Sequence, residues 1–118
     1  MPSDSESIQV SFTLPFRKNV KKLSKRYRHI RSDLQPLIDQ LSAGELPGVQ
    51  LSGIEVPMFK VRLKNSDNRK GKSGGYRVVY YVKTQNQVVL IIVFSKSDVA
   101  DIGVSELIEI MTEYDQSS

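Results

Sequence analysis

The chain has 118 residues, of which 39% are hydrophobic and 25% are charged, as expected of one globular domain with its own core. It contains no cysteine and one histidine, His29, which excludes disulfides, thiolate or multi-histidine metal sites and cysteine nucleophiles and disfavours a Ser-His-Asp triad. The formal net charge of +4 favours a polyanionic partner.

The ends of the chain and its longest apolar run predict a soluble protein. Residues 1–7 are polar and acidic, unlike a signal peptide, and we expect them and residues 114–118 to be flexible. The longest apolar run has seven residues, which is too short to cross a bilayer. The sequence therefore predicts a cytoplasmic protein with a single domain over residues 8–113.

The first half of the chain predicts a strand followed by two helices. Apolar and polar residues alternate over residues 8–14, which is the period of a half-buried strand. Pro15 suits the first turn of a helix, and an apolar stripe at helical spacing covers residues 16–27. A second stripe covers residues 34–41, after a pattern at Ser32 that resembles a capping box. Two helices joined so closely predict a helical hairpin.

The second half predicts three strands and a short helix. Residues 45–57 contain two prolines and two glycines, as expected of a loop. Strands are predicted at residues 58–63, 76–82 and 88–94, the last apolar at every position like a central strand. A helix is predicted after Gly103. The fold class is therefore α+β: an N-terminal strand, a two-helix hairpin, and a twisted, mainly antiparallel sheet of about four strands with a short C-terminal helix.

The charges are divided into two basic blocks and an acidic end. Residues 17–31 carry eight Lys or Arg residues and no acid, and residues 60–77 carry seven more with only Asp67 among them. Every charged side chain after Lys96 is acidic. For the first block, a solvated helix face and a surface that contacts ribosomal RNA are equally good interpretations.

The second block differs because its charges alternate with apolar residues. Lys60, Arg62 and Lys64 share one face of a predicted strand, where like charges repel each other unless an anion lies among them. Arg77 opens the next strand and Lys96 follows the apolar strand, so we expect both to join the same patch. A face that only keeps the protein soluble is the alternative interpretation.

Such a patch has the chemistry to bind and cleave RNA. Guanidinium donors match phosphate oxygens, and clustered cations stabilise the extra charge on phosphorus when a 2′-hydroxyl attacks it. Without a usable histidine or metal site, proton transfer falls to lysine, arginine, tyrosine or an acid, and crowding by other cations lowers the pKa of a lysine. Tyr81 shares the face of Arg77 by parity and is expected to stack on a base.

Four segments carry a family resemblance. They are Phe-Lys-Val-Arg-Leu at residues 59–63, Gly-Lys-Ser-Gly-Gly-Tyr-Arg-Val-Val-Tyr-Tyr at residues 71–81, Val-Leu-Ile-Ile-Val-Phe-Ser-Lys-Ser-Asp at residues 89–98, and Asp101-Ile102. With these segments the chain resembles the RelE/ParE toxin superfamily, and within it the RelE/HigB-like branch with a Lys-Ser-Gly-Gly-x-Arg-Val motif. The similarity extends over residues 8–111.

The resemblance implies the toxin of a type II toxin–antitoxin system. Many such toxins inhibit translation as endoribonucleases (mRNA interferases) that cut mRNA in the A site of the 30S ribosomal subunit. They use no metal or other cofactor, and attack by a 2′-hydroxyl leaves a cyclic phosphate. The resemblance also implies a cognate antitoxin that blocks the basic face or displaces the last helix, and a complex that binds operator DNA through the antitoxin.

Matching by motif also assigns roles to residues. The catalytic residues implied by the resemblance are Arg62, Arg77, Lys96 and Lys64. With the basic helix included, the residues expected to bind RNA are Lys60, Lys72, Tyr81, Lys21, Lys25 and Arg28. No histidine lies near the C-terminus and Tyr114 lies in the acidic tail, so the general acid and base are left open.

Two other functions fit the same sequence. A ParE-like inhibitor of DNA gyrase would act by binding on the same fold, and a non-catalytic relative would keep the patch as an RNA-binding surface. The concentration of cations on strands, at motif positions, favours the ribonuclease.

Smaller expectations concern single residues. His29 is expected to lie on a helix surface, and Asp98 and Asp101 are expected to be caps or salt-bridge partners rather than metal ligands. Gly74 and Gly75 either let the backbone approach a phosphate or form a turn or bulge.

Overall fold

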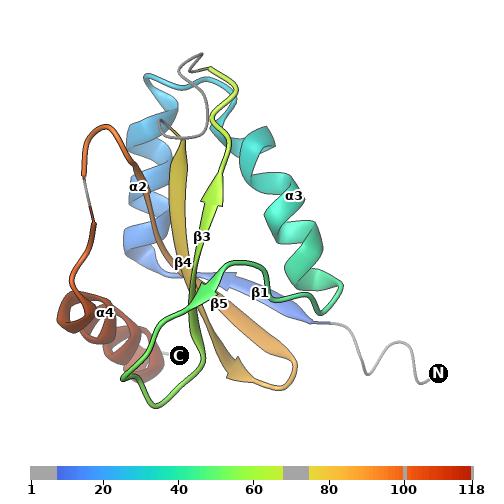
Figure 1. The fold of residues 1–118 in the computed structure, drawn as a ribbon, viewed down its shortest axis with the longest axis vertical. Helices are drawn as coiled ribbons and strands as arrows, with labels where there is room; N and C mark the ends of the chain where they lie inside the picture. Colours follow the sequence, from blue (N-terminus) through green and yellow to red (C-terminus); the bar gives the residue numbers. More distant parts are fainter. Residues whose placement is uncertain (1–7, 68–74, 100, 118) are drawn as a thin grey trace.

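The computed structural model describes residues 8–67, 75–99 and 101–117. Within them it has, in chain order, β1 (Gln9–Phe12), α2 (Leu14–Ser24), α3 (Ile30–Ser42), β2 (Val49–Gln50), β3 (Met58–Leu63), β4 (Tyr76–Thr84), β5 (Gln87–Ser95) and α4 (Val104–Ser117). The strands form one mixed sheet in the order β1-β5-β4-β3-β2 (Figure 1), in which β1 is parallel to β5 and the other neighbours are antiparallel. The predicted α+β class is confirmed, with five strands where about four were expected.

The additional strand is β2, which lies at the edge of the sheet inside the region predicted to be a loop. Only Val49 and Gln50 pair with β3, a length that leaves no periodic pattern in the sequence. Gly48 precedes the pair with a φ of +100°, and a Cβ at this position would lie 2.5 Å from the carbonyl oxygen of Lys60. A glycine is therefore needed for the edge to approach β3 this closely.

Helix α2 begins where the sequence predicts it to begin, and Thr13 fixes its start. The Thr13 hydroxyl accepts a hydrogen bond from the backbone N–H of Phe16 and donates one to the carbonyl of Ile91 in β5. The same side chain thus caps the helix and ties it to the sheet. The helix ends at Ser24, three residues before the predicted end of its stripe.

Helix α3 begins at Ile30, two residues before the predicted cap at Ser32. The carboxylate of Asp67 accepts hydrogen bonds from the backbone N–H of His29 at 2.8 Å and from its ring, with Nδ1 at 2.7 Å. Ser32 instead donates to the carbonyl of His29. The capping-box expectation is therefore wrong, because a carboxylate far away in sequence satisfies the start of this helix.

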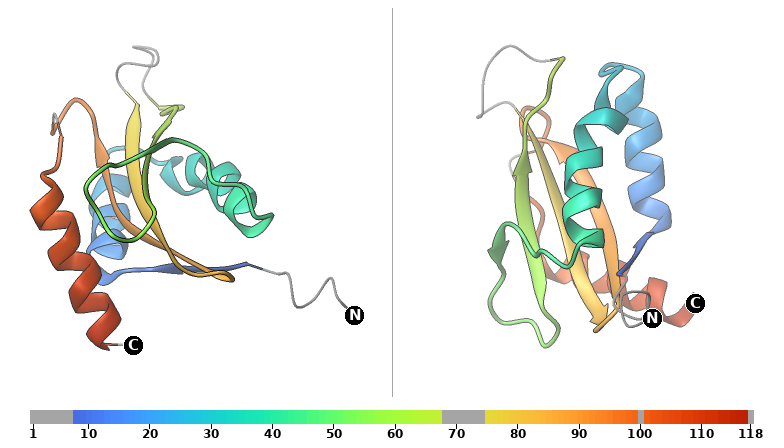
Figure 2. Two further views of the ribbon diagram at one scale, coloured as in Figure 1. Left: turned by 60° about the horizontal axis from the view of Figure 1, so that its bottom comes forward. Right: turned by 90° about the vertical axis from the view of Figure 1, so that its right-hand side faces the viewer.

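The sheet is covered on both faces, which gives the molecule two cores. Helices α2 and α3 lie side by side on one face (Figure 2) and pack on residues that include Val78, Tyr80 and Leu90. Leu107 of α4 packs on the other face, in the core that contains Val79. Strand β5 lies between β1 and β4 with residues 88–95 all buried, as predicted for a central strand.

Helix α4 is longer than the sequence predicts and continues to Ser117, past the domain boundary expected at residue 113. Asp115 explains the extra turn, since its carboxylate accepts a hydrogen bond from the Tyr81 hydroxyl at 2.6 Å and lies 3.5 Å from the Lys83 ammonium. These contacts join the last turn of the helix to β4.

Candidate nucleic-acid interface

Four cationic side chains line one open pocket of about 510 Å³, which we call the cation pocket. They come from three separate β-segments: Lys60 and Arg62 from β3, Arg77 from β4, and Lys96 from the residue that follows β5. The lining is completed by Gly48, Val49 and Asp101. The convergence that the sequence predicts for these four cations is therefore present in the structure.

The pairing of β3 with β4 brings the two arginines together. Arg62 lies directly opposite Arg77 in this antiparallel pair, and Lys60 is two residues away on the same face. Cβ atoms of directly opposed residues are about 5 Å apart, so that the like charges repel each other. The strand ladder, not mutual attraction, holds these cations in one place.

A β-bulge in β5 decides the face on which Lys96 lies. Tyr80 is opposite Leu90 while Val79 is opposite Ile92, so Ile91 is an extra residue. Strict alternation from Leu90 would place Lys96 on the face of α2 and α3, and the bulge moves it to the face of Arg77. The backbone N–H of Lys96 donates to the carbonyl of Gly75 at 3.0 Å, which holds this residue beside the start of β4.

Arg77 is the most deeply placed cation of the pocket, with 8% of its surface exposed. Its Nη1 donates to the carbonyl of Tyr76 at 3.2 Å, and no carboxylate among the described residues forms a salt bridge with it. Burial first, and then the charge of Arg62, lowers the pKa of the Arg77 guanidinium from its usual value. An arginine remains charged under these conditions, so the site holds a desolvated cation suited to an anionic ligand.

Asp101 is the one carboxylate among the described residues that line the pocket. Its Oδ1 accepts a hydrogen bond from the Lys60 ammonium at 2.9 Å and one from the backbone N–H of Ile102 at 2.8 Å. The bond from Lys60 contributes most to lowering the pKa of the Asp101 carboxyl, followed by that from Ile102. The expected salt-bridge role is confirmed for Asp101 and also for Asp98, which pairs with Arg26.

Two of the residues predicted for this site do not line the pocket. Lys64 is exposed beyond the end of β3, outside the lining. Tyr81 lies on the face of Arg77 as expected, but it is 1% exposed in the core beneath α4, and its hydroxyl is bound to Asp115. The prediction that Tyr81 stacks on a base is therefore wrong for this structure. The alternation of side chains along a strand predicts the face of the sheet on which a residue lies, but not whether a helix covers that face. Lys72 lies outside the described residues.

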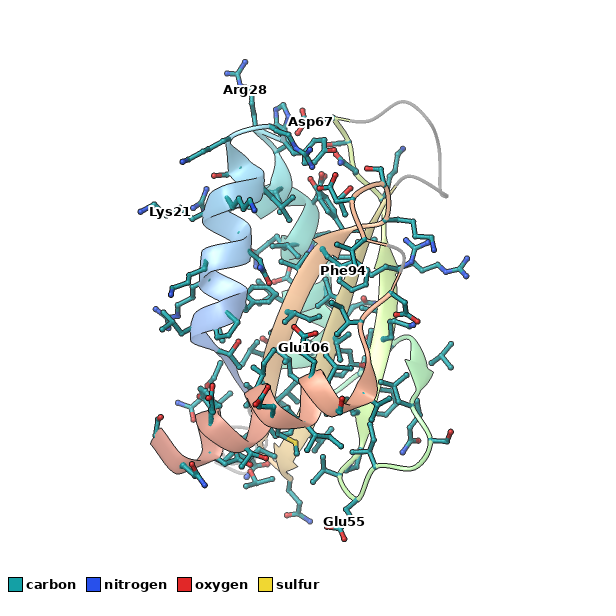
Figure 3. All side chains as sticks on the ribbon, turned by 90° about the vertical axis from the view of Figure 1, so that its left-hand side faces the viewer. Lys21, Arg28, Glu55, Asp67, Phe94 and Glu106 are labelled. Carbon is teal, nitrogen blue, oxygen red and sulfur yellow. The ribbon has the colours of Figure 1, made fainter. Side chains whose placement is uncertain are left out.

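The predicted RNA-binding residues Lys21, Lys25 and Arg28 form a separate surface. All three are exposed, on α2 and in the turn that follows it, and α2 packs on the sheet face opposite to Arg77. Figure 3 shows Lys21 pointing away from the sheet and Arg28 at the end of the helix near Asp67. The exposed cations of α2 thus lie on the other side of the sheet from the cation pocket.

The structure also answers the remaining single-residue expectations except that for Gly74, which lies outside the described residues. His29 is exposed at the start of α3, as expected. Gly75 is needed for a reason other than a phosphate approach or a turn or bulge. A Cβ there would lie 2.2 Å from the carbonyl oxygen of Leu63, so the neighbouring strand leaves no space for a side chain. Sequence reasoning missed Gly48 and Val49 as lining residues, because their strand is too short to give a signal.

No protein-family model matches the chain, and no curated protein matches it. Within the described ranges, no helix has the length and hydrophobicity needed to span a bilayer. The same part of the chain has no group of three or more His, Asp or Glu side chains placed to hold a metal ion.

Proposed function

We propose that this protein is a RelE-like toxin that cuts mRNA on the ribosome without a metal ion. The observation that carries the proposal is the cation pocket, in which Lys60, Arg62, Arg77 and Lys96 surround a hollow of about 510 Å³. Clustered like charges cost stability and are retained where they bind an anion. The sequence resemblance supplies the class of substrate.

In the proposed reaction the pocket binds the phosphate between two nucleotides. The 2′-oxygen attacks phosphorus, the bond from phosphorus to O5′ breaks, and the products are a 2′,3′-cyclic phosphate and a 5′-hydroxyl. The negative charge on the non-bridging oxygens increases in the transition state. Arg77 has little solvent around it to screen its charge, so its attraction for that state exceeds that of an exposed cation.

The proposal includes the partners that belong to such toxins. The substrate is mRNA in the A site of the 30S subunit, and the basic surface of α2 is available for contact with ribosomal RNA. A cognate antitoxin would neutralise the toxin and carry the complex to operator DNA. Activity in the cytoplasm follows from these partners.

The first test is to add the purified protein to a reconstituted translation reaction and to map the 5′ ends of the message. We expect cuts in register with codons, cyclic phosphate at the upstream ends, and the same cuts on programmed ribosomes without the other translation factors. Intact messages, with DNA-damage signals when the protein is induced in cells, would overturn the ribonuclease and favour the gyrase inhibitor.

The second test removes one pocket charge at a time. We expect Arg62→Ala and Arg77→Gln each to lower the cleavage rate by about 100- to 1000-fold, the usual loss when one group that stabilises transition-state charge is removed. Arg31→Ala is the matched control, because Arg31 is exposed in the groove between α2 and α3, outside the pocket. Wild-type rates in both pocket variants, with circular dichroism spectra unchanged, would contradict the site.

A further inference from the structure

Asp101 is a carboxylate among cations in a pocket that would hold a polyanion, where it forms a salt bridge with Lys60. A carboxylate repels phosphate, so its presence in the lining weakens RNA binding. A carboxylate that weakens ligand binding and yet lies in the binding site is a candidate for a catalytic role.

The two oxygens of Asp101 have different surroundings. Oδ1 accepts both of the hydrogen bonds made to this side chain, from Lys60 and from the backbone of Ile102. Oδ2 accepts none from the described residues. The side chain is 61% exposed, which leaves this oxygen accessible to a ligand in the pocket. One oxygen therefore holds the carboxylate in place, and the other is available.

The backbone around Asp101 limits its movement. Ile102, which donates to Oδ1, packs against the core beneath α4, and α4 begins two residues later at Val104. The carboxylate thus has contacts on two sides: the backbone of its partly buried neighbour Ile102 and the ammonium of Lys60 in β3. A group fixed from two sides is in the state that catalysis requires of a proton acceptor.

Asp101 is also the lining residue that is ready to accept a proton. Guanidinium and ammonium groups carry their protons at neutral pH and have no free lone pair. Tyr81, the tyrosine predicted for this face, is buried, and its hydroxyl is bound to Asp115. An aspartate is ionised at neutral pH, and the hydrogen bonds from Lys60 and Ile102 lower the pKa of Asp101 further, so it accepts a proton as a carboxylate of reduced basicity.

We propose that Asp101 is the general base of the RNA cleavage reaction, an inference that rests on the proposed function. Oδ2 takes the proton of the 2′-hydroxyl, and the oxygen uses the electron pair released to form its bond to phosphorus. The bond to O5′ breaks with its electron pair, and O5′ takes a proton from the Lys60 ammonium. Proton exchange with solvent, from Asp101 and to the Lys60 amine, then returns the carboxylate and the ammonium to their starting states.

The experiment is single-turnover cleavage of mRNA on programmed ribosomes by wild type and Asp101→Asn. An asparagine keeps an oxygen that can accept from Lys60 and Ile102, but it cannot take a proton. We expect the maximal rate to fall by at least about 100-fold, in the usual range for loss of a general base, while the concentration for half-maximal rate is unchanged or lower. Asp98→Asn is the control, since that carboxylate is on the same connection but pairs with Arg26.

A second measurement separates catalysis from structure. In Asp101→Ala, formate added to the reaction is expected to raise the cleavage rate in proportion to its concentration, with no such effect on wild type. A carboxylate that served only to position Lys60 would not give a rate that depends on the basicity of added carboxylates. Rescue that strengthens from formate to acetate therefore supports a proton acceptor.

The possible failures are distinguishable. If wild type cleaves and Asp101→Asn cleaves at the wild-type rate or faster, Asp101 only weakens binding and the inference is overturned, while the proposed function stands. If Asp101→Ala is inactive and no carboxylate rescues it, the role as base is also overturned. If wild type itself leaves every message intact, the proposed function fails first.

Discussion

Arg77 is a buried cation whose surroundings oppose its charge. It is 8% exposed, lies opposite Arg62, and has no salt-bridge partner among the described residues. Both burial and Arg62 lower its pKa, which means that the folded protein disfavours the charged form. The charge of Arg77 therefore does not stabilise the fold, and binding of an anionic ligand is the role that accounts for it.

We therefore predict that Arg77→Gln does not lower stability. Because the folded state lowers the pKa of this arginine, its charge costs free energy at every pH below that pKa, and a neutral side chain of related shape removes the cost. The midpoint of urea unfolding at pH 7 is expected to be equal to or above that of wild type. A midpoint clearly lower than that of the Arg31→Gln control would show that Arg77 supports the fold.

Gly75 gives the second prediction, since the backbone there leaves no space for a side chain. A Cβ would lie 2.2 Å from the carbonyl oxygen of Leu63, which belongs to the backbone of β3 and cannot rotate away. The carbonyl of Gly75 also accepts the hydrogen bond from Lys96, so a shift here moves a wall of the cation pocket. We expect Gly75→Ala to lower the free energy of unfolding by about 2 kcal/mol or more.

Gly103→Ala is the matched control for this substitution. A Cβ at Gly103 meets no atom within 4 Å, so we expect a change within about 1 kcal/mol, the range of a cap or chain-entropy effect. Urea denaturation followed by circular dichroism measures both variants. Equal stability losses in the two would contradict the steric argument.

At the scale of elements, the sequence predicts strands better than their irregularities. Residues 88–94 are apolar at every position, which correctly indicates burial on both faces but carries no alternation in which an extra residue would be visible. Two contacts from α2 and its N-cap flank the bulge at Ile91: Thr13 donates to the carbonyl of Ile91, and the side-chain oxygen of Asn19 accepts from the N–H of Val93. Such contacts are set by packing between elements and leave no local pattern.

Hydrogen bonds join the start of α3 to Asp67, in the segment that follows β3, and this contact is sensitive to acid. The hydrogen bonds from the His29 ring and from its backbone N–H lower the pKa of Asp67 below its usual value near 3.8. A lowered pKa in the folded state stabilises the protein above the unfolded value, and this contribution is lost as pH falls through the folded value. The pair therefore supports the fold at neutral pH and not in strong acid.

We accordingly predict that Asp67→Asn lowers the unfolding midpoint at pH 7 and that its difference from wild type shrinks below about pH 4. The measurement is urea denaturation of both proteins from pH 7 to pH 3. Glu55→Gln serves as the control, since that exposed carboxylate forms no hydrogen bond or salt bridge within the described part of the chain. A difference that stays constant to pH 3 would rule out Asp67 as the titrating group.

For the whole molecule, the sequence determines the net charge, but the fold determines which charged side chains lie close together. The net charge of +4 and the two basic blocks can be read from the sequence, and strand parity correctly groups Lys60, Arg62 and Arg77. That the cations of α2 lie on the opposite side of the sheet follows only from where this helix packs. The burial of Tyr81 also could not be predicted from the sequence, because it depends on how far α4 extends over the sheet.

This arrangement predicts how RNA binding responds to salt. Each contact between a cation and a phosphate of a single strand adds about 0.7 to the slope of log K against log salt concentration. Arg62 is exposed in the cation pocket, so Arg62→Ala is expected to reduce the slope by about that amount. Arg31 lies in the groove between the two helices across the sheet, where screening over about 10 Å at 0.1 M salt separates it from RNA in the pocket.

The measurement is fluorescence anisotropy of a short, labelled 2′-O-methyl RNA, which cannot be cleaved, titrated at several KCl concentrations. We expect a shallower slope for Arg62→Ala and the wild-type slope for Arg31→Ala, although both variants lose the same charge. A uniform decrease in both would mean that RNA responds to the net charge of the molecule. In that case binding would not be localised to the cation pocket, and the argument for a shaped phosphate site would fail with it.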